Sequence, residues 1–415
     1  MAFHKFALAF FLIAGLCLFC VACVWDNTEE VSAFLPLDDS EYPYADLPRL
    51  VIETDNFSQI RDKTTKHAAR VQIWGKNSPE SDIMETSISG RGFSSFEMPK
   101  YGYSLRFATS TSFLKFSKGK KWDLIANYAD KTLLRNYISF SLANSIGMKY
   151  TPHSEFVELY LNRRYMGVFL LAEHITVSKN RVNLPKKPSS FLLEMEPYVE
   201  DESLYISTEM GTSYKVRYPK EPQSIYVDSL VTFLNSWEKY IYNDKTKDSI
   251  SNWFNLDEYI RFYWVQEFSK NNDAAYGRSV FFTWQTGSQL CTGPVWDFDV
   301  AYGNKPQDYM QSPKNWHLRI RGWNKPFFST EKLKKTIADF WEQNHKKFEA
   351  LTDSVDSYSS LLNKAVKNEY KRWNISEPSD FGNSRDIYHT HQESVDSLKS
   401  WIKQRIIWID NNYKE

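Results

Sequence analysis

The sequence has few cysteines outside its first residues. Three of the four, Cys17, Cys20 and Cys23, lie within the N-terminal 23 residues, and only Cys291 lies beyond them. A framework of structural disulfides needs paired cysteines along the folded chain. With Cys23 assigned to lipid, as argued below, Cys291 has no partner, and we therefore expect no disulfide.

Net charge, repeats and later apolar runs are also lacking. The 51 Lys and Arg residues balance the 51 Asp and Glu residues, so no overall field favours nucleic acid or an anionic membrane as a partner. No internal repeat is evident, and after residue 23 no stretch is apolar for long enough to cross a membrane. The 415 residues allow two or three average domains or one large domain.

The N-terminus has the pattern of a secretion signal. Lys5 precedes an uncharged apolar run, Phe6 to Cys23, which is short for a membrane span but suits a signal peptide. The run ends in CVAC, which resembles a bacterial lipobox, with Cys20 in place of the usual leucine. We predict a signal peptide over residues 1–23, a lipid on Cys23 and an exported lipoprotein anchored to a membrane of the cell envelope. Ordinary secretion and an uncleaved anchor are the alternatives.

The composition changes after the signal pattern. Residues 24–47 are acidic and contain proline, which is typical of a tether. We therefore expect one folded domain over residues 48–413. Aromatic residues make up 16% of the chain, enough for a large packed core and also for a surface that stacks on sugars, so a carbohydrate-binding function stays open.

The order of the expected elements predicts an α+β fold. Short strand-like runs, rich in β-branched and aromatic residues, dominate residues 50–107. One helix follows and ends at Gly147, and two strands joined by a tight NRRY turn come next. The second half shows helical periodicity in several long segments. A β-rich N-terminal lobe and a mostly helical C-terminal lobe are expected.

Two acids lie in an apolar stretch, GPVWDFDVAYG. A buried, unpaired carboxylate tends to be protonated or to find a cation. Alternate residues of an extended segment share a face, so Asp297 and Asp299 should point to one side while Phe298 packs on the other. A metal site and a pair of salt-bridged structural acids both fit this pattern.

A third acid lies upstream in NNDAAYGR. Asp273 precedes Asp297 by 24 residues, and the segment between them reads as a hairpin that would bring both acids to one end of a sheet. A phosphotransferase uses such a pair: one acid orients or deprotonates the attacking hydroxyl, and another holds Mg²⁺ against the nucleotide phosphates. A turn cap is the competing interpretation of Asp273.

Several motifs in order make the chain similar to the CotH kinases, atypical protein kinases named after spore coat protein H. They are SGRGFSSFEMPKYGYSLRF, KWDLIANYADKTLLRN, LYLNRRYMGVFLLAEHI, KNND, GPVWDFDVAYG and LKSWIKQRIIWID, and they cover about residues 50–412. The resemblance implies a kinase-like fold of two lobes. It also implies transfer of a phosphoryl group from ATP, with Mg²⁺ or Mn²⁺, to Ser or Thr of an exported or surface protein.

The resemblance implies roles for individual residues. Asp273 would be the catalytic-loop acid, Asp297 the main metal ligand and Asp299 a second ligand, although the two ligands could be exchanged. Arg91, between two glycines, and Lys100 would contact phosphates. Arg91 paired with a surface acid and Lys100 free in solvent are the competing interpretations.

Other positions have an alternative interpretation or depart from the family pattern. Glu173 lies where a kinase hinge would be and would contact the base or ribose, with a structural salt bridge as the alternative. Lys100 is expected in a polar loop, where its loss would cost little stability. Tyr101 stands where the family often has a second lysine, and Arg278, followed by Ser279, replaces the second metal-binding asparagine of protein kinases.

Two other functions are compatible with the sequence. A non-catalytic surface lipoprotein of the same fold would bind polysaccharide or an envelope partner through aromatic residues such as Trp316 and Trp323. A glycoside hydrolase would use paired acids, but Asp297 and Asp299 lie on a single element. Binding of Mg-ATP distinguishes the kinase from both.

Overall fold

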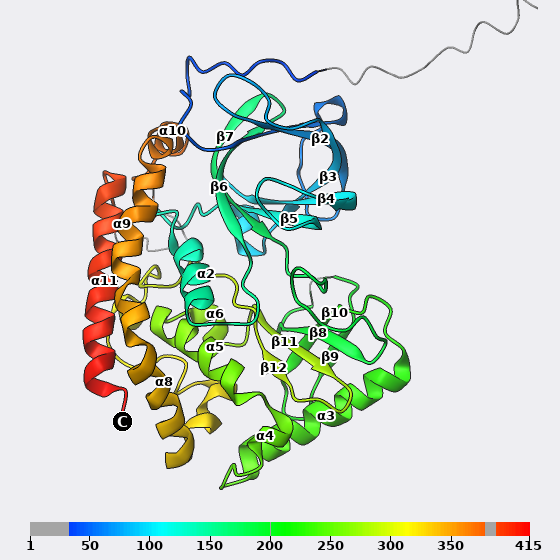
Figure 1. Ribbon diagram of the computed structural model, residues 1–415, viewed down its shortest axis with the longest axis vertical. Coiled ribbons are helices and arrows are strands. Elements are labelled where there is room, and N and C mark those ends of the chain that lie inside the picture. The colour runs from blue at the N-terminus through cyan, green and yellow to red at the C-terminus, as the bar shows by residue number, and fades with distance from the viewer. Residues whose placement is uncertain (1–32, 200, 378–386) are drawn as a thin grey trace, which may run out of the picture. The chain divides into compact units, whose positions relative to one another are not determined.

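The computed structural model describes residues 33–199, 201–377 and 387–415 (Figure 1). The predictions for the signal peptide and for Cys23 lie outside these residues. Ser40–Glu415 forms one compact unit. No helix within the described ranges combines the length and the apolar character that a membrane span needs.

A closed barrel forms the first part of this unit. Its strands are β1 (Arg49–Thr54), β2 (His67–Trp74), β3 (Met84–Arg91), β4 (Gly102–Thr111), β5 (Gly119–Ile125), β6 (Ser154–Leu161) and β7 (Arg164–Glu173). They follow the order β1-β2-β3-β4-β5-β7-β6, and β1 closes the barrel by pairing in parallel with β6. Apolar side chains such as Val71, Leu105 and Trp122 are fully buried in one core, because alternate residues of each strand share a face.

A second sheet of five strands follows the barrel. Its strands are β8 (Ser190–Met195), β9 (Tyr205–Ser207), β10 (Ser213–Tyr218), β11 (Val280–Gln285) and β12 (Cys291–Thr292), in the order β12-β11-β8-β10-β9. Strands β11 and β12 pair antiparallel, with Thr283 opposite Cys291. This pairing confirms the hairpin predicted between Asp273 and Asp297.

Helices make up most of the remainder. They are α2 (Arg135–Ser145), α3 (Ser224–Asn243), α4 (Ile250–Trp253), α5 (Leu256–Ser269), α6 (Asn272–Ala275), α7 (Asp308–Gln311), α8 (Glu331–Glu349), α9 (Leu351–Leu362), α10 (Ala365–Arg372) and α11 (His391–Asn412), with short 3-10 turns η1 (Asp55–Phe57), η2 (Ser94–Glu97) and η3 (Gly322–Phe328). Helix α5 starts at the N-cap Asn255, whose side chain accepts the Glu258 N–H. From Tyr259 to Ser269 nearly all of its residues are buried, which makes α5 the central helix of the second core.

The α+β class predicted from the sequence is confirmed, with one large core inside the barrel and another among α2, the second sheet and the C-terminal helices. The predicted tether ends too late at residue 47. Ala45 and Leu47 are buried, Asp46 pairs with Lys364, and the Tyr42 ring stacks on Tyr165 at 4.3 Å. Apolar and aromatic residues in this acidic segment therefore join the folded unit.

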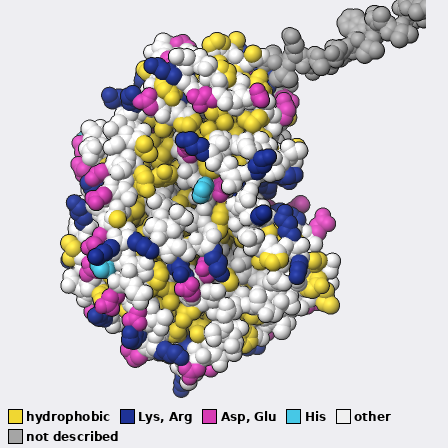
Figure 2. Space-filling view, viewed as in Figure 1, with side chains coloured by type: hydrophobic (Ala, Val, Ile, Leu, Met, Phe, Trp, Pro, Cys, Tyr) yellow, Lys and Arg dark blue, Asp and Glu magenta, His cyan; other side chains and the backbone are white. Residues whose placement is uncertain are grey.

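The described surface carries both signs of charge. On the face shown in Figure 2, Lys and Arg side chains alternate with Asp and Glu, and neither sign dominates. This distribution agrees with the zero net charge of the chain. The face offers no broad basic stripe of the kind that tracks a nucleic acid backbone.

Candidate functional site

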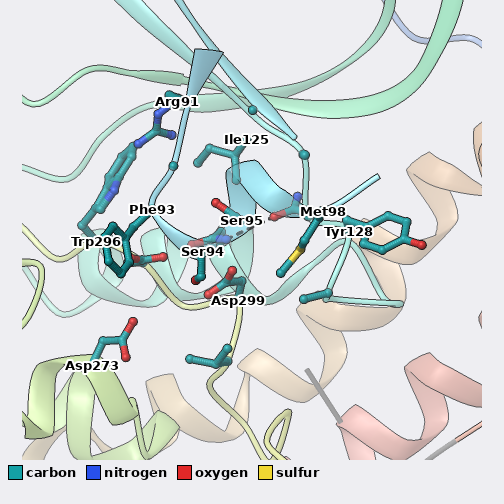
Figure 3. A pocket seen from close by; sticks show the side chains of 18 of the residues that line it. Arg91, Phe93, Ser94, Ser95, Met98, Ile125, Tyr128, Asp273, Trp296 and Asp299 are labelled. Atoms are coloured by element: carbon teal, nitrogen blue, oxygen red, sulfur yellow. Dashed lines mark hydrogen bonds between the residues drawn. The ribbon is translucent and has the colours of Figure 1, made fainter. Parts of the chain in front are cut away.

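The three acids predicted from the sequence line one cavity of about 340 Å³, which we call chamber 1 (Figure 3). Asp273 enters it from α6, and Asp299 from the loop after β12. The barrel supplies the opposite wall from the end of β3, the loop before β4 and the segment after β5. Chamber 1 is lined by Arg91–Ser95, Met98, Lys100, Gly102, Ile125–Ala129, Asn136, Asp273, Arg278, Trp296, Asp297, Asp299, Val300 and Lys305.

The loop that carries two of the acids is turned rather than extended. Asp297 has a φ of 66°, a left-handed conformation that costs an L-residue about 1–2 kcal/mol. Asp297 and Asp299 nevertheless both line chamber 1, and Phe298 is fully buried with its ring edge-on to Phe140. The predicted directions of the three side chains are correct, but a turn at Asp297 produces them.

Asparagine side chains from three segments hold this loop at successive residues. Asn136 Oδ1 accepts the Phe298 N–H (2.9 Å), Asn271 Nδ2 donates to the Asp297 carbonyl (2.8 Å) and Asn304 Nδ2 donates to the Asp299 carbonyl (2.5 Å). These bonds fix the backbone on both sides of each acid. Sequence reasoning missed Asn271 and Asn304, because a single asparagine has neither periodicity nor spacing; the KNND motif was the one available signal for Asn271.

The third acid is positioned by a sharp turn between two helices. Lys270 ends α5 in the left-handed conformation, with a φ of 48°. Asn271 then caps the one-turn helix α6 by accepting the Asp273 N–H at 3.2 Å. The reversal brings the Asp273 carboxylate to chamber 1.

The electrostatics of chamber 1 favour a cation. Burial and then the charge of Asp297 raise the pKa of Asp273 to about 6. Burial also raises the pKa of Asp297. Burial and then the charges of Asp297 and Asp273 raise the pKa of Asp299 well above its usual range. A cluster whose members raise one another's pKa is stabilised by a positive ion between them.

Basic side chains lie around the acids. The Arg91 guanidinium lies over the Trp296 ring at 5.3 Å, and its Nε is 3.5 Å from Asp123 Oδ1. The Arg278 guanidinium lies about equally close to the Phe93 and Tyr198 rings, at 5.0 and 5.1 Å. Lys305 completes the set, and its charge lowers the pKa of Asp273 and Asp299. Arg91 thus lines the same chamber as the three acids, and its phosphate contact stays a prediction.

Lys100 differs from its predicted environment. Its side chain is fully buried, and Nζ donates to the Val168 carbonyl (2.6 Å) and to Glu369 Oε1 (2.6 Å). The prediction that Lys100 lies in a polar loop is therefore wrong, and the small stability cost that was based on it no longer follows. Lys100 borders chamber 1, but in this structure the ammonium is engaged by Val168 and Glu369 and does not face the acids as a free phosphate ligand.

Glu173 lies outside the chamber. Its carboxylate is buried, 3.8 Å from the Arg181 guanidinium, and accepts hydrogen bonds from the Tyr150 hydroxyl (3.2 Å) and the His153 N–H (3.3 Å). These internal partners match the structural salt bridge that the sequence left as the alternative. The predicted contact of Glu173 with a base or ribose has no counterpart in this placement, because strand β7 directs the side chain into the interior.

A second cavity of about 410 Å³, which we call chamber 2, adjoins chamber 1. The two share the wall formed by Arg91–Phe93, Arg278, Trp296 and Asp297. Ser279, which follows Arg278, lines chamber 2 and donates to Asp297 Oδ2 at 3.1 Å. His174, next to Glu173, also lines it. Sequence reasoning overlooked His174 because a lone histidine at a strand end has no pattern.

The donor set of chamber 1 fits a hard divalent cation. The carboxylates of Asp297 and Asp299 supply oxygen ligands, which Mg²⁺ prefers. Within the described ranges, no group of three or more His, Cys, Asp or Glu side chains is arranged to hold a metal by itself. Many Mg²⁺ sites use one or two carboxylates and complete the coordination with substrate phosphates and water.

The aromatic residues considered for sugar binding are packed. The Trp316 ring meets Trp408 edge-on at 4.8 Å and lies under the Arg319 guanidinium at 3.6 Å. Trp323 packs against Phe282 at 5.5 Å and belongs to the margin of the second core. These rings stabilise the fold and do not form an open stacking platform.

Comparison with known proteins gives one family. A family model described as CotH kinase protein matches residues 88–409, which is most of the chain. A search of curated proteins finds no match. The matched span contains every residue that lines chamber 1, including all three acids, and the hairpin between Asp273 and Asp297.

Proposed function

The chain belongs to the CotH kinase protein family, and we propose on this basis that it transfers the γ-phosphoryl group of ATP to a Ser or Thr hydroxyl of a protein. One observation carries the proposal: Asp273, Asp297 and Asp299 meet in chamber 1 beside a Gly-Arg-Gly segment. The signal pattern of the N-terminus supports an exported or surface protein as the acceptor.

Asp297 and Asp299 are the proposed ligands of Mg²⁺. Bound there, the ion would neutralise charge on the phosphates and on the transferring phosphoryl group. The three asparagines that hold the acid loop would keep both carboxylates directed into chamber 1 as charge changes. A fixed loop reduces the reorganisation needed at the moment of transfer.

Asp273 is the proposed base. It would accept the proton of the acceptor hydroxyl while that oxygen forms its bond to the γ-phosphorus. The bond between the γ-phosphorus and the β–γ bridging oxygen breaks, and ADP leaves with this electron pair. A pKa raised by burial makes Asp273 a stronger proton acceptor than an exposed carboxylate.

The loop after β3 is suited to approach phosphates closely. Gly92 has a φ of 109°, which only glycine adopts readily. A Cβ at Gly90 would lie 2.8 Å from the Asp62 carbonyl and even closer to the Phe96 ring. Arg91, held between these glycines over Trp296, would supply a guanidinium for bidentate phosphate contact.

The test separates the roles of two acids. The purified full chain is assayed for Mg-ATP binding by calorimetry and for transfer of labelled phosphate to itself and to dephosphorylated casein. Asp297→Asn should weaken Mg-ATP binding and lower transfer on the order of 10²-fold or more. Asp273→Asn should lower transfer while Mg-ATP binding stays close to wild type.

Asp339→Asn is the matched control, because Asp339 is a half-exposed acid on α8, outside both chambers, that pairs with Lys335. It should behave like wild type in both assays. Wild-type binding and transfer by Asp297→Asn would refute the metal assignment. Absence of Mg-ATP binding by the wild-type chain would refute the kinase proposal itself.

A further inference from the structure

An arginine between two tyrosines lies beside α6, the helix that carries Asp273. The Arg321 guanidinium lies 5.7 Å from the centre of the Tyr276 ring and 5.6 Å from the centre of the Tyr309 ring. Tyr276 is 57% exposed and Tyr309 is 48% exposed, so the group is open to a ligand from solvent. We call these three residues the Arg321 platform. The proposed transfer uses none of them.

The platform lies close to the proposed base. Tyr276 follows Asp273 by three residues at the end of α6. Residues three apart on a helix are near neighbours, so the ring contact places the guanidinium within about 15 Å of the Asp273 Cα. Lys305 links the same two places, because it lines chamber 1 and precedes Tyr309 by four residues. An extended peptide with its hydroxyl at Asp273 would reach Arg321 in about four residues.

Buried charges hold the loop of the platform in place. Lys270, three residues before Asp273, uses all three N–H groups of its buried ammonium on backbone carbonyls of this loop. The acceptors belong to Tyr309 (2.7 Å), Ser312 (2.9 Å) and Lys314 (2.9 Å). The buried Glu267 carboxylate accepts three successive backbone N–H groups, from His317 to Arg319, at 2.8, 2.7 and 2.9 Å. The loop is therefore fixed to the segment that also positions Asp273.

The guanidinium itself is oriented by His317. Arg321 Nη1 donates to His317 Nδ1 and to the His317 carbonyl, both at 2.8 Å. Burial and then the charge of Arg321 lower the pKa of His317 to about 3, so the ring is neutral and Nδ1 can accept. These bonds use both N–H groups of Nη1. The edge formed by Nε and Nη2 has no carboxylate partner among the residues that the structure describes, and such an edge binds a carboxylate or phosphate through two parallel hydrogen bonds.

Neighbouring cations make the platform electropositive. Burial, and then the charges of Arg405 and Arg321, lower the pKa of Lys270 to about 7. Cations that lower one another's pKa are stabilised by a negative charge between or beside them. The hydroxyl groups of Tyr276 and Tyr309 are further hydrogen-bond donors at the same place. An anionic group therefore fits the platform better than a neutral one.

We propose that the Arg321 platform binds an anionic side chain of the acceptor protein about four residues from the Ser or Thr at Asp273. The anion is the carboxylate of Asp or Glu, or the phosphoryl group of a residue that is already phosphorylated. The inference deepens the proposed function and rests on it for the identity of the acceptor. Arg321 would then be a specificity-determining residue, because a neutral side chain at that position of the acceptor leaves the Nε–Nη2 edge unpaired.

The experiment measures binding of the acceptor without ATP. Three short fluorescent peptides share a central Ala in place of the acceptor Ser, and they carry Glu, phosphoserine or Gln at the fourth position on either side of it. Fluorescence anisotropy gives their affinities for the full chain. The wild-type protein should bind the Glu peptide, the phosphoserine peptide or both about tenfold or more tightly than the Gln peptide. The tighter of the two anionic peptides identifies the source of the anion. In Arg321→Gln the three affinities should become equal.

Arg372→Gln is the matched control and should keep the preference. Arg372 also lies over a ring, that of Trp373 at 4.1 Å, and donates to the Tyr165 carbonyl, but it is on α10 and lines neither chamber. Circular dichroism reports whether Arg321→Gln folds. If it does not, Arg321→Lys takes its place: this variant keeps the charge but loses the two-pronged edge, and it should bind the anionic peptides more weakly than wild type does.

The outcomes separate this inference from the kinase proposal. Equal affinities of the wild-type chain for the three peptides, or no binding of either anionic peptide at about 1 mM, would overturn the inference even if phosphoryl transfer occurs. A preference that survives in Arg321→Gln would overturn it too. Displacement of the bound peptide by Mg-ATP would assign the platform to nucleotide phosphates, with the same consequence. A preference that depends on Arg321 in a chain without any transfer would support the inference and count against the kinase.

Discussion

Lys100 Nζ lies 2.6 Å from Oε1 of Glu369, a residue 269 positions later in the chain. Both side chains are buried, and the other oxygen of Glu369 accepts the Val168 N–H at 2.6 Å. The pair therefore joins α10 to strand β7 and to the start of β4, next to chamber 1. Gly167 permits this approach, since a Cβ there would lie 2.3 Å from Glu369 Oε2.

Loss of Lys100 is expected to destabilise the protein strongly. Lys100→Ala leaves the Glu369 carboxylate buried without its cation, and breaking a buried pair in this way costs about 3–5 kcal/mol. The free energy of unfolding from urea titrations measures the loss. Lys100→Met combined with Glu369→Leu should be less destabilised than Lys100→Ala alone, because no buried charge remains. A loss near zero for Lys100→Ala would show that water reaches the pair.

The acids of chamber 1 are expected to lower the stability of the metal-free protein as pH rises. Asp273 has a folded pKa of about 6 against an ordinary value of 3.8. Between these values the folded state binds more protons than the unfolded state, so the free energy of unfolding falls with increasing pH. At pH 7 Asp273→Asn should be more stable than wild type, on the order of 1–2 kcal/mol.

Thermal unfolding of both proteins from pH 4 to pH 8 checks this expectation. The difference in stability should vanish near pH 4, where the carboxyl group is protonated in the folded state. Asp339→Asn, at a half-exposed position of α8, should show no such difference. A constant gap between wild type and Asp273→Asn across the range would contradict the expectation.

Asn136 is expected to act as a positioning residue. Asn136→Ala leaves the buried Phe298 N–H without the acceptor that now lies 2.9 Å away, at a cost of about 1–2 kcal/mol. The looser loop should also weaken binding of Mn²⁺ in the presence of ATP, which electron paramagnetic resonance measures directly. Asn411→Ala, on the exposed side of α11, is the matched control. Unchanged Mn²⁺ affinity in Asn136→Ala would leave Asn136 with a structural role only.

Cys23 is expected to carry a lipid in the mature protein. The signal pattern ends at this residue, and lipoprotein processing cleaves before the modified cysteine. Mass spectrometry of the membrane fraction should find a lipid adduct on Cys23 as the N-terminal residue, and globomycin should block its formation. An intact Met1 or a cut elsewhere would contradict lipidation, as would a Cys23→Ser chain that is processed normally.

The positions of the acids could be predicted from the sequence because local patterns control them. The hairpin β11–β12 connects segments only a few residues apart, so pairing of its strands brings the flanking loops together. The predicted closeness of Asp273 and Asp297 follows from that pairing. Phe298 was predicted to pack in the interior because it is an apolar residue between two acids. In the structure its side chain is fully buried.

The environments of Lys100, Glu173 and His174 depended on contacts between distant segments. Lys100 lies in a stretch of mixed polarity, and nothing near it indicates Glu369, which reaches it only after α10 docks on the barrel. Glu173 and His174 are adjacent, yet β7 sends one side chain to Arg181 and the next to Asp123. Which neighbour faces the interior and which the chamber depends on strand register.

The sequence alone determined the fold class, the family resemblance and the set of acids, because hydrophobic periodicity and short motifs act over a few residues. Only the tertiary structure decided which charged groups remain available to a ligand. A charge is available when folding leaves it without a buried partner, and that partner can come from any point in the chain. For this reason Lys100 became part of the framework, whereas Asp273, Asp297 and Asp299 face chamber 1.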